Sequence, residues 1–254
     1  MQIFMASLNY PYLASFWSQS MVEVNLLVFL HLAGALALGL MVGYERSYHG
    51  RAAGMRTYGI VCMASAALTV FAGYPGFWWG GTGHSMVPVD PTRVVQGIVT
   101  GVGFLGAGVI MKDGLNISGL TTAASIWASS AIGVLVGVGF FAAAILLTFL
   151  SVVLMMWGPK LESRLPSRRA LGVTMGFSPG LEPDEAEMKR TIGGWGYMVA
   201  EGSLHISATR SHVTWEFVMV ALQSRPEPSS LFELSRRLRA VAGVDQLEIS
   251  HARN

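Results

Sequence analysis

The sequence predicts an α-helical integral membrane domain of about five transmembrane helices, followed by a small α+β domain with the ferredoxin-like order βαββαβ. Three observations lead to this prediction. The 254 residues are 52% hydrophobic and only 13% charged, whereas soluble domains carry about 25% charged residues. Apolar runs of membrane-spanning length follow one another up to residue 158. Beyond Arg169 the charge density becomes ordinary, and strand and helix patterns alternate.

Five apolar runs are long enough to cross a hydrocarbon core, which takes about 20 helical residues. They cover about residues 23–42, 58–77, 92–111, 120–136 and 140–157. Residues 1–21 contain no lysine or arginine, so the basic region of a cleaved signal peptide is missing. Instead, an aromatic cluster predicts an interfacial anchor. Its members are Tyr10, Tyr12, Phe16 and Trp17.

Basic residues set the predicted orientation. Lysine or arginine occurs in three connecting segments: residues 44–57, the turn at Lys112 and the segment after residue 157. The loop 78–91 contains neither. The positive-inside rule therefore places the N-terminus outside and the C-terminal domain in the cytoplasm. We divide the chain into a transmembrane domain (1–158), a basic linker (159–170) and a cytoplasmic domain (171–254).

Glycines in the third run predict close packing of membrane helices. Gly97 and Gly101 have the small-xxx-small spacing that lets two helix backbones approach, and Gly39 and Gly43 repeat this spacing in the first run. The candidate packing residues are Gly97, Gly101, Gly103, Gly106, Gly108, Thr121 and Thr122. We expect the polar side chains of Gln96, Thr100, Ser125, Ser129 and Ser130 to form hydrogen bonds between helices.

The last 84 residues predict the ferredoxin-like domain element by element. Alternating apolar residues indicate strands over 171–177, 198–209, 213–222 and 245–251. The segment EPDEAEMKRTIGG has the acids first and the bases late, as a capped helix prefers. Ser230 and Glu233 form a capping box that begins a second helix with Leu234 and Leu238 on its apolar face.

The composition and motifs argue against several functional classes. A net charge of +2 is too small to indicate nucleic-acid binding, and the single cysteine, Cys62, excludes an intramolecular disulfide. The sequence has no hydrolase elbow, phosphate-binding loop or HExxH motif, and GVGFLG lacks the preceding strand that a dinucleotide-binding loop needs. We therefore expect neither an enzyme nor a bound cofactor.

Charged residues at membrane depth are the candidate functional residues, because they are costly to place there. His31 is the deepest, either as a hydrogen-bonded histidine between helices or as a proton or ion relay. At the predicted cytoplasmic face, Glu45 and Asp113 either form ion pairs with Arg46 and Arg56 or offer carboxylate oxygens to Mg²⁺.

Asp90 and Arg93 lie at the opposite interface. Because Asp90-Pro91 opens a helix, Asp90 is predicted to cap it, with Arg93 as a charge partner.

The segments GYER at 43–46, AAGMRT at 52–57, DPTRVVQGIVTGVGFLGAGVIMKDGLNISGLTTAASIW at 90–127 and AIGVLVGVGF at 131–140 resemble the MgtC/SapB family of bacterial membrane proteins. The resemblance implies an inner-membrane domain and an ACT-like cytoplasmic domain. It also implies a role in magnesium-limited growth and virulence, and modulation of membrane partners such as the F1Fo ATP synthase. The family's motif positions correspond to Glu45, Arg56, Asp90, Arg93, Gly103, Gly106 and Thr121.

Three hypotheses on function follow. The chain is a regulatory membrane protein in magnesium homeostasis or stress adaptation that binds other membrane complexes. Alternatively, it is a transporter or channel for a small cation, Mg²⁺ or H⁺, that uses His31 and the polar faces of the third and fourth spans. The third hypothesis is a structural membrane scaffold that forms a homodimer through its glycine faces and its ACT-like tails.

Overall fold

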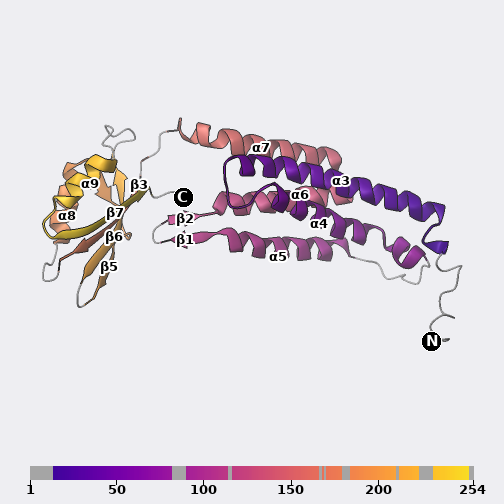
Figure 1. The fold of residues 1–254 in the computed structure, drawn as a ribbon, viewed down its shortest axis with the longest axis horizontal. Coiled ribbons are helices and arrows are strands. Elements are labelled where there is room, and N and C mark those ends of the chain that lie inside the picture. Colours follow the sequence, from indigo (N-terminus) through magenta and orange to yellow (C-terminus); the bar gives the residue numbers. More distant parts are fainter. Residues whose placement is uncertain are drawn as a thin grey trace. The chain divides into compact units, whose positions relative to one another are not determined.

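The computed structural model describes residues 14–81, 90–113, 116–165, 168, 170–178, 184–209, 212–222 and 231–251. The predicted anchor residues Tyr10 and Tyr12 and the capping residue Ser230 lie outside these ranges. The chain divides into two compact units. The first is built from long helices, and the second contains an antiparallel sheet with helices α8 and α9 on one face (Figure 1).

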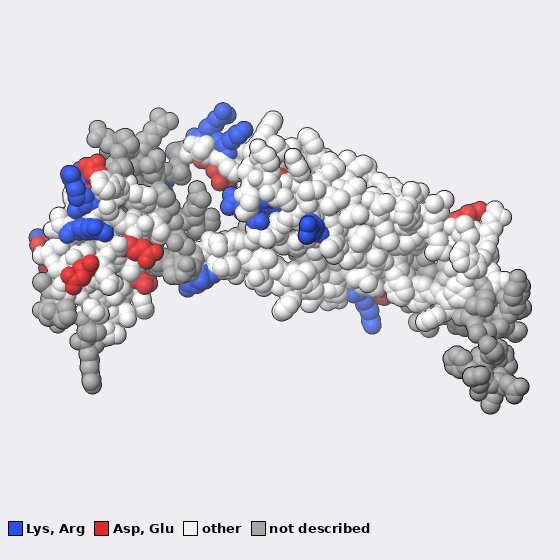
Figure 2. Space-filling model, viewed as in Figure 1, with Lys and Arg blue, Asp and Glu red and all other residues white. Residues whose placement is uncertain are grey.

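Within the described ranges, five helices are long and apolar enough to cross a membrane, which confirms the predicted five spans. They are α3 (Gln19–Tyr48), α4 (Met55–Gly73), α5 (Pro91–Val109), α6 (Leu120–Val138) and α7 (Phe141–Glu162). Their outer surfaces carry many exposed large apolar side chains, such as Phe29, Phe104 and Leu154. Figure 2 shows that most of this surface is white, because it carries neither acidic nor basic side chains. Such a surface suits lipid rather than water.

Three helices differ from the sequence prediction at their C-terminal ends. Helix α7 continues to Glu162 instead of ending at residue 157. Helix α3 continues to Tyr48, although its last residues were expected to belong to a polar loop. The helix can continue because Glu45 and Arg46 bind each other and are both buried. Helix α4 ends at Gly73 instead of residue 77, and the 3₁₀ helix η1 (Pro75–Gly81) follows it, as expected where Pro75 cannot supply a backbone N–H to α4.

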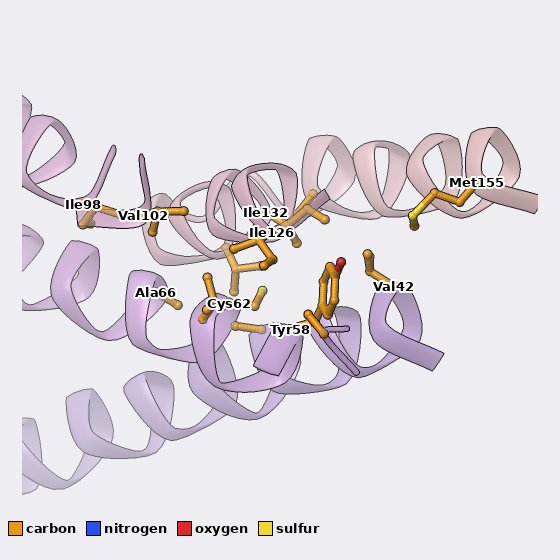
Figure 3. Close-up of a cluster of buried hydrophobic side chains, with 14 residues drawn as sticks. Val42, Tyr58, Cys62, Ala66, Ile98, Val102, Ile126, Ile132 and Met155 are labelled. Carbon is orange, nitrogen blue, oxygen red and sulfur yellow. The ribbon is translucent and has the colours of Figure 1, made fainter. Parts of the chain in front are cut away.

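Helices α3, α4 and α6 form the centre of the helical unit (Figure 3). Tyr58, Cys62 and Ala66 of α4 are completely buried, as is Ile132 of α6. Helix α5 adds Ile98 and Val102 to this core, and α7 adds Ala144 and Met155, so both contribute less to it than the three central helices.

Glycines allow the three central helices to approach each other closely. A Cβ atom added at Gly133 of α6 would lie 2.1 Å from the carbonyl oxygen of Cys62, and one at Gly137 would lie 2.6 Å from Thr69 Cβ. On α3, a Cβ at Gly39 would lie 2.7 Å from Cys62 Cβ, and one at Gly43 would lie 2.6 Å from the Cα of a residue at the start of α4. The predicted close packing at Gly39 and Gly43 is therefore confirmed.

Two short strands, β1 (Met111–Asp113) and β2 (Asn116–Ser118), form an antiparallel hairpin where the sequence predicted a polar turn between α5 and α6. Gly119 follows β2 with φ +88°, and a Cβ there would lie 2.0 Å from the carbonyl oxygen of Val109. The position therefore needs glycine for its backbone conformation as well as for space.

The second unit follows the predicted βαββαβ order, except that the second predicted strand is divided into two, β4 and β5. Its elements are β3 (Ala170–Phe177), α8 (Glu185–Gly194), β4 (Tyr197–Val199), β5 (His205–Ala208), β6 (Val213–Ala221), α9 (Leu231–Arg239) and β7 (Val244–His251). The strand order is β4-β6-β3-β7, with β5 also paired to β6, and all pairs are antiparallel. Val173 on β3 lies between Phe217 of β6 and Ile249 of β7 in the register.

The predicted strand at 198–209 is broken into β4 and β5, which pair with opposite ends of β6. Gly202 turns the chain between them with φ +74°. Ser203 Oγ accepts a hydrogen bond of 3.1 Å from the backbone N–H of Val218, and the N–H of Ala200 donates to the Val218 carbonyl at 2.8 Å. These two bonds satisfy the backbone of β6 where the neighbouring strand is interrupted.

Candidate functional site

The α3–α4 corner contains a buried ion pair. Glu45 and Arg46, near the end of α3, are only 6% and 5% exposed, and Arg46 Nε lies 2.5 Å from Glu45 Oε2. His49 Nδ1 lies 3.1 Å from the other carboxylate oxygen of Glu45 and 3.0 Å from its backbone carbonyl oxygen. Since the His49 side chain is about half exposed, it is the member of this group that meets solvent.

The corner itself is held by backbone and hydroxyl contacts. Ser47 Oγ accepts a 2.9 Å hydrogen bond from the N–H of Met55, the first residue of α4. The N–H of Arg51 donates to the carbonyl oxygen of Arg46, and Ala53 is buried. The carboxylate of Glu45 therefore lies within an ordered connection between α3 and α4, and not in a polar loop.

A seam of hydroxyl groups continues along the contact between α4 and α6. Tyr58 Oη lies 2.6 Å from Ser125 Oγ, and Ser129 Oγ donates to the backbone carbonyl of Tyr58 at 3.0 Å. The hydroxyl groups of Ser65 and Ser130 form a hydrogen bond with 2.8 Å between their oxygens. The hydrogen bonds between helices predicted for Ser125, Ser129 and Ser130 are thus confirmed, and each satisfies a polar group that lipid cannot satisfy.

His31 lies apart from this seam. Its Nδ1 is 2.7 Å from the carbonyl oxygen of Leu27 in its own helix, and its ring packs 5.1 Å from the ring of Phe141 on α7. The side chain is 7% exposed. This geometry matches a packed, hydrogen-bonded histidine between α3 and α7.

Of the other two candidates predicted at the cytoplasmic face, the structure describes only the side chain of Arg56, which does not join the Glu45–Arg46 pair. Arg56 is exposed at the start of α4 and is in no ion pair with a described residue. Asp113 belongs to strand β1, and its side chain lies outside the described part of the structure. Its role, either in an ion pair with Arg46 or Arg56 or as a second carboxylate for Mg²⁺, therefore stays a prediction.

Magnesium coordination by Glu45 does not fit the observed contacts. One carboxylate oxygen binds the Arg46 guanidinium, and the other faces the His49 ring. A divalent cation would have to displace a buried, charged partner before it could bind there. Among the described residues, no three side chains from His, Cys, Asp and Glu lie close enough together to hold a metal ion.

Asp90 caps α5, as predicted. Its Oδ1 accepts hydrogen bonds from the backbone N–H of Thr92 at 2.9 Å and from the Thr92 hydroxyl at 2.6 Å, while Arg93 Nε lies 3.6 Å from Oδ2. The hydroxyl bond of Thr92 is the main reason that the pKa of Asp90 is lowered from its ordinary value.

Replacing Asp90 by alanine is expected to fray the first turn of α5, because the Thr92 N–H loses its acceptor. Amide hydrogen exchange at Thr92 should become several-fold faster, whereas Asp90→Ser should keep the slow exchange. Since the folded pKa is lowered, the charged cap is fully present above the ordinary aspartate pKa of about 3.9 and is lost as the pH falls through the lowered value. Equal exchange rates in all three proteins at neutral pH would contradict this role.

The predicted packing residues of α5 and α6 lie in different surroundings. A Cβ added at Gly106 would contact Ala123 of α6 at 3.7 Å. At the other four α5 glycines an added Cβ would meet no atom of the described chain within 4 Å. These four are Gly97, Gly101, Gly103 and Gly108. On α6, Thr122 is buried and Thr121 is exposed, so within this chain the packing prediction holds at Gly106 and Thr122.

Sequence reasoning missed several residues of the central packing. His49 lies in a segment that was expected to be a polar loop, and Tyr58 and Ser65 were not singled out because a tyrosine or serine in an apolar run gives no signal by itself. The Gly133–Gly137 pair did carry a signal, because it has the same small-xxx-small spacing as Gly39–Gly43.

Comparison with known proteins agrees with this architecture. The model of the MgtC family matches residues 32–164, which include all of α4 to α7 and most of α3. Protein MgtC of Brucella abortus (strain 2308) is 44% identical over 119 residues, 46% of this chain and 45% of that protein. Protein MgtC of Salmonella typhimurium (strain LT2) is 39% identical over 132 residues, 51% of this chain and 52% of that protein.

The matches have two limits. The chain spans about half the length of the relatives that it matches, and the family match ends before β3 begins. No solved structure is significantly similar to the chain.

Proposed function

Because the chain belongs to the MgtC family, we propose that it regulates adaptation to low magnesium and related stress by binding other complexes in the bacterial inner membrane. The family and the five apolar helices establish a multi-pass membrane protein. The regulatory role, the cytoplasmic position of the C-terminal unit and the partner are the proposal. The F1Fo ATP synthase is the first partner to test, because the sequence resemblance implies it.

Tight packing of α3, α4 and α6 is the observation that supports regulation over transport. At Gly133 the two helix backbones are so close that a Cβ would lie 2.1 Å from the Cys62 carbonyl oxygen. Ser129 and Ile132 beside it are completely buried. An ion would need a hydrated path, and the contact at Gly133 is too close to hold water between α4 and α6.

Transport of a small cation is the second candidate, and one observation favours it. The hydroxyls of Tyr58, Ser65, Ser125 and Ser130 form short hydrogen bonds between two membrane helices, and polar residues inside a membrane are costly to place there and are often functional. The third candidate, a self-associating scaffold, needs neither transport nor a foreign partner.

A growth and flux experiment separates the three candidates. A strain that lacks the chain should grow poorly in limiting magnesium and recover when the gene is restored, and a vector without the gene is the control. Under the proposal, cross-linking in these cells captures a membrane complex, while the purified protein in liposomes moves neither Mg²⁺ nor H⁺. Cation flux would favour the transporter, and capture of only a second copy of the chain would favour the scaffold.

A further inference from the structure

The outward surface of α9 combines one aromatic ring with two arginines. Leu234 and Leu238 are the buried residues of this helix, and Phe232, Arg236 and Arg239 fall on the opposite side of the 3.6-residue turn. The Phe232 side chain is 78% exposed, and both arginines are exposed. We call Phe232, Arg236 and Arg239 the α9 outer face.

The positive charge of the α9 outer face is not neutralised within the helix. Glu233 is the single carboxylate of α9, and its Oε1 lies 2.7 Å from Nη2 of Arg237, which is on the flank of the helix. In the ranges that the structure describes, neither Arg236 nor Arg239 takes part in an ion pair. The surface is therefore suited to an anionic partner.

A groove of about 300 Å³ lies beside this face, between α9 and β7. Its lining contains one cationic side chain among mainly apolar ones. The lining residues are Leu231, Phe232, Ser235, Arg239, Leu247 and Ile249. A guanidinium next to exposed apolar carbon is the combination that binds an anionic amphiphile, because it meets both its charged group and its hydrocarbon.

The chain keeps α9 close to a membrane whichever way the protein is oriented. Helix α7, the last membrane helix, ends at Glu162, and β3 begins at Ala170. The connection of seven residues reaches at most about 28 Å when fully extended. A surface held this close is at a high effective concentration, so a weak attraction is enough for binding.

We propose that the α9 outer face and its groove bind anionic phospholipid of the membrane that holds the chain. Arg236 and Arg239 contact lipid phosphates, and the Phe232 ring enters the boundary between headgroups and acyl chains. The proposal rests on the membrane location of the chain and is independent of its proposed regulatory role.

A spin label on the full chain tests this proposal. Ala240 is exposed at the end of α9 and belongs neither to the outer face nor to the groove. A nitroxide is attached to Ala240→Cys in a Cys62→Ala background, and the protein is placed in nanodiscs of phosphatidylcholine with or without phosphatidylglycerol. Accessibility of the label to oxygen and to a water-soluble nickel chelate reports its depth, and size-exclusion chromatography confirms that each variant is folded.

With phosphatidylglycerol, the label should become more accessible to oxygen and less accessible to nickel. Arg236→Gln and Arg239→Gln should each lower the affinity of the α9 outer face for the anionic membrane about fivefold. Phe232→Ser should also lower this affinity. The double variant Glu233→Gln/Arg237→Gln removes the flanking ion pair without changing the net charge, so it should leave the shift intact. Salt near 1 M, where the Debye length is about 3 Å, should abolish the shift.

Several outcomes would overturn the proposal. The label could stay in water in both lipids, or it could keep its shift in the Arg236→Gln/Arg239→Gln variant. A short distance between labels on two copies, independent of lipid charge, would assign the α9 outer face to a second copy of the chain.

Discussion

Gly133→Ala is expected to destabilise the helical unit more than any other single-methyl addition considered for its helices. The new Cβ would lie 2.1 Å from the carbonyl oxygen of Cys62 and 2.9 Å from the Ser65 side chain. Because the first of these atoms belongs to the backbone, no rotamer change relieves the clash, and α4 and α6 must separate. We expect a loss of about 3 kcal/mol of unfolding free energy, at the upper end for an overpacked core.

Thermal unfolding of the purified protein in detergent measures this loss. Gly101→Ala is the matched control, because it adds the same methyl group to a helix where the Cβ meets no atom of the described chain within 4 Å. The control should unfold at or slightly above the temperature of the unmodified protein, since alanine favours a helix over glycine. Equal destabilisation by both substitutions would show that the α4–α6 contact is not close.

Glu45→Gln is expected to have an effect at least as large as that of Gly133→Ala, because it leaves the buried Arg46 guanidinium without its counter-charge. Removing one partner of a buried ion pair costs about 3–5 kcal/mol, whereas replacing both by apolar groups is often neutral. The double variant Glu45→Gln/Arg46→Met should therefore recover most of the lost stability. Thermal unfolding and the amount of protein in the membrane are the measurements.

Glu23→Gln provides the control for this pair. It makes the same change in the same helix, but Glu23 is exposed and only accepts a hydrogen bond from Gln19, so its stability should not change. The double variant also separates structure from function. If Glu45→Gln/Arg46→Met is stable but fails to restore growth in limiting magnesium, the charges themselves serve the function. If Glu45→Gln alone is fully stable, the buried pair does not support the corner.

The membrane helices could be predicted from sequence because their signal is local. Hydropathy and length suffice to find a span, and Asp90-Pro91 marks the start of α5 by its own chemistry. The end of α3 could not be found in this way. Glu45 and Arg46 would normally indicate a polar loop, and their burial depends on contacts that fold around them from α4.

The number of glycines in a helix was a poor guide to where helices pack closely. Helix α5 has the most glycines, yet Gly97, Gly101, Gly103 and Gly108 face no other helix of the described chain. Between the described helices, the closest backbone approach occurs at Gly133 of α6, where the sequence drew attention to the serines instead. Which face of a helix meets a partner is decided by the other helices, and a single sequence does not contain that information.

The interrupted strand in the second unit shows the same limit. Alternating residues predicted one strand over 198–209, and the turn at Gly202 divides it. The hydroxyl of Ser203 then takes the place of a backbone partner for Val218. A glycine followed by serine is compatible with an interruption of the strand, but the sequence does not show that the backbone of β6 needs a hydroxyl partner at this point.

The unequal lengths of the membrane helices have a consequence for the surrounding lipid. Helices α4, α5 and α6 each have 19 residues, or about 28 Å along the axis, whereas α3 has 30 residues, or about 45 Å. The shorter helices match a thin hydrocarbon layer, and α3 must tilt or project beyond it. Bilayers with longer acyl chains would strain this arrangement, so the folded protein should be most stable where the hydrocarbon layer is about 28 Å thick.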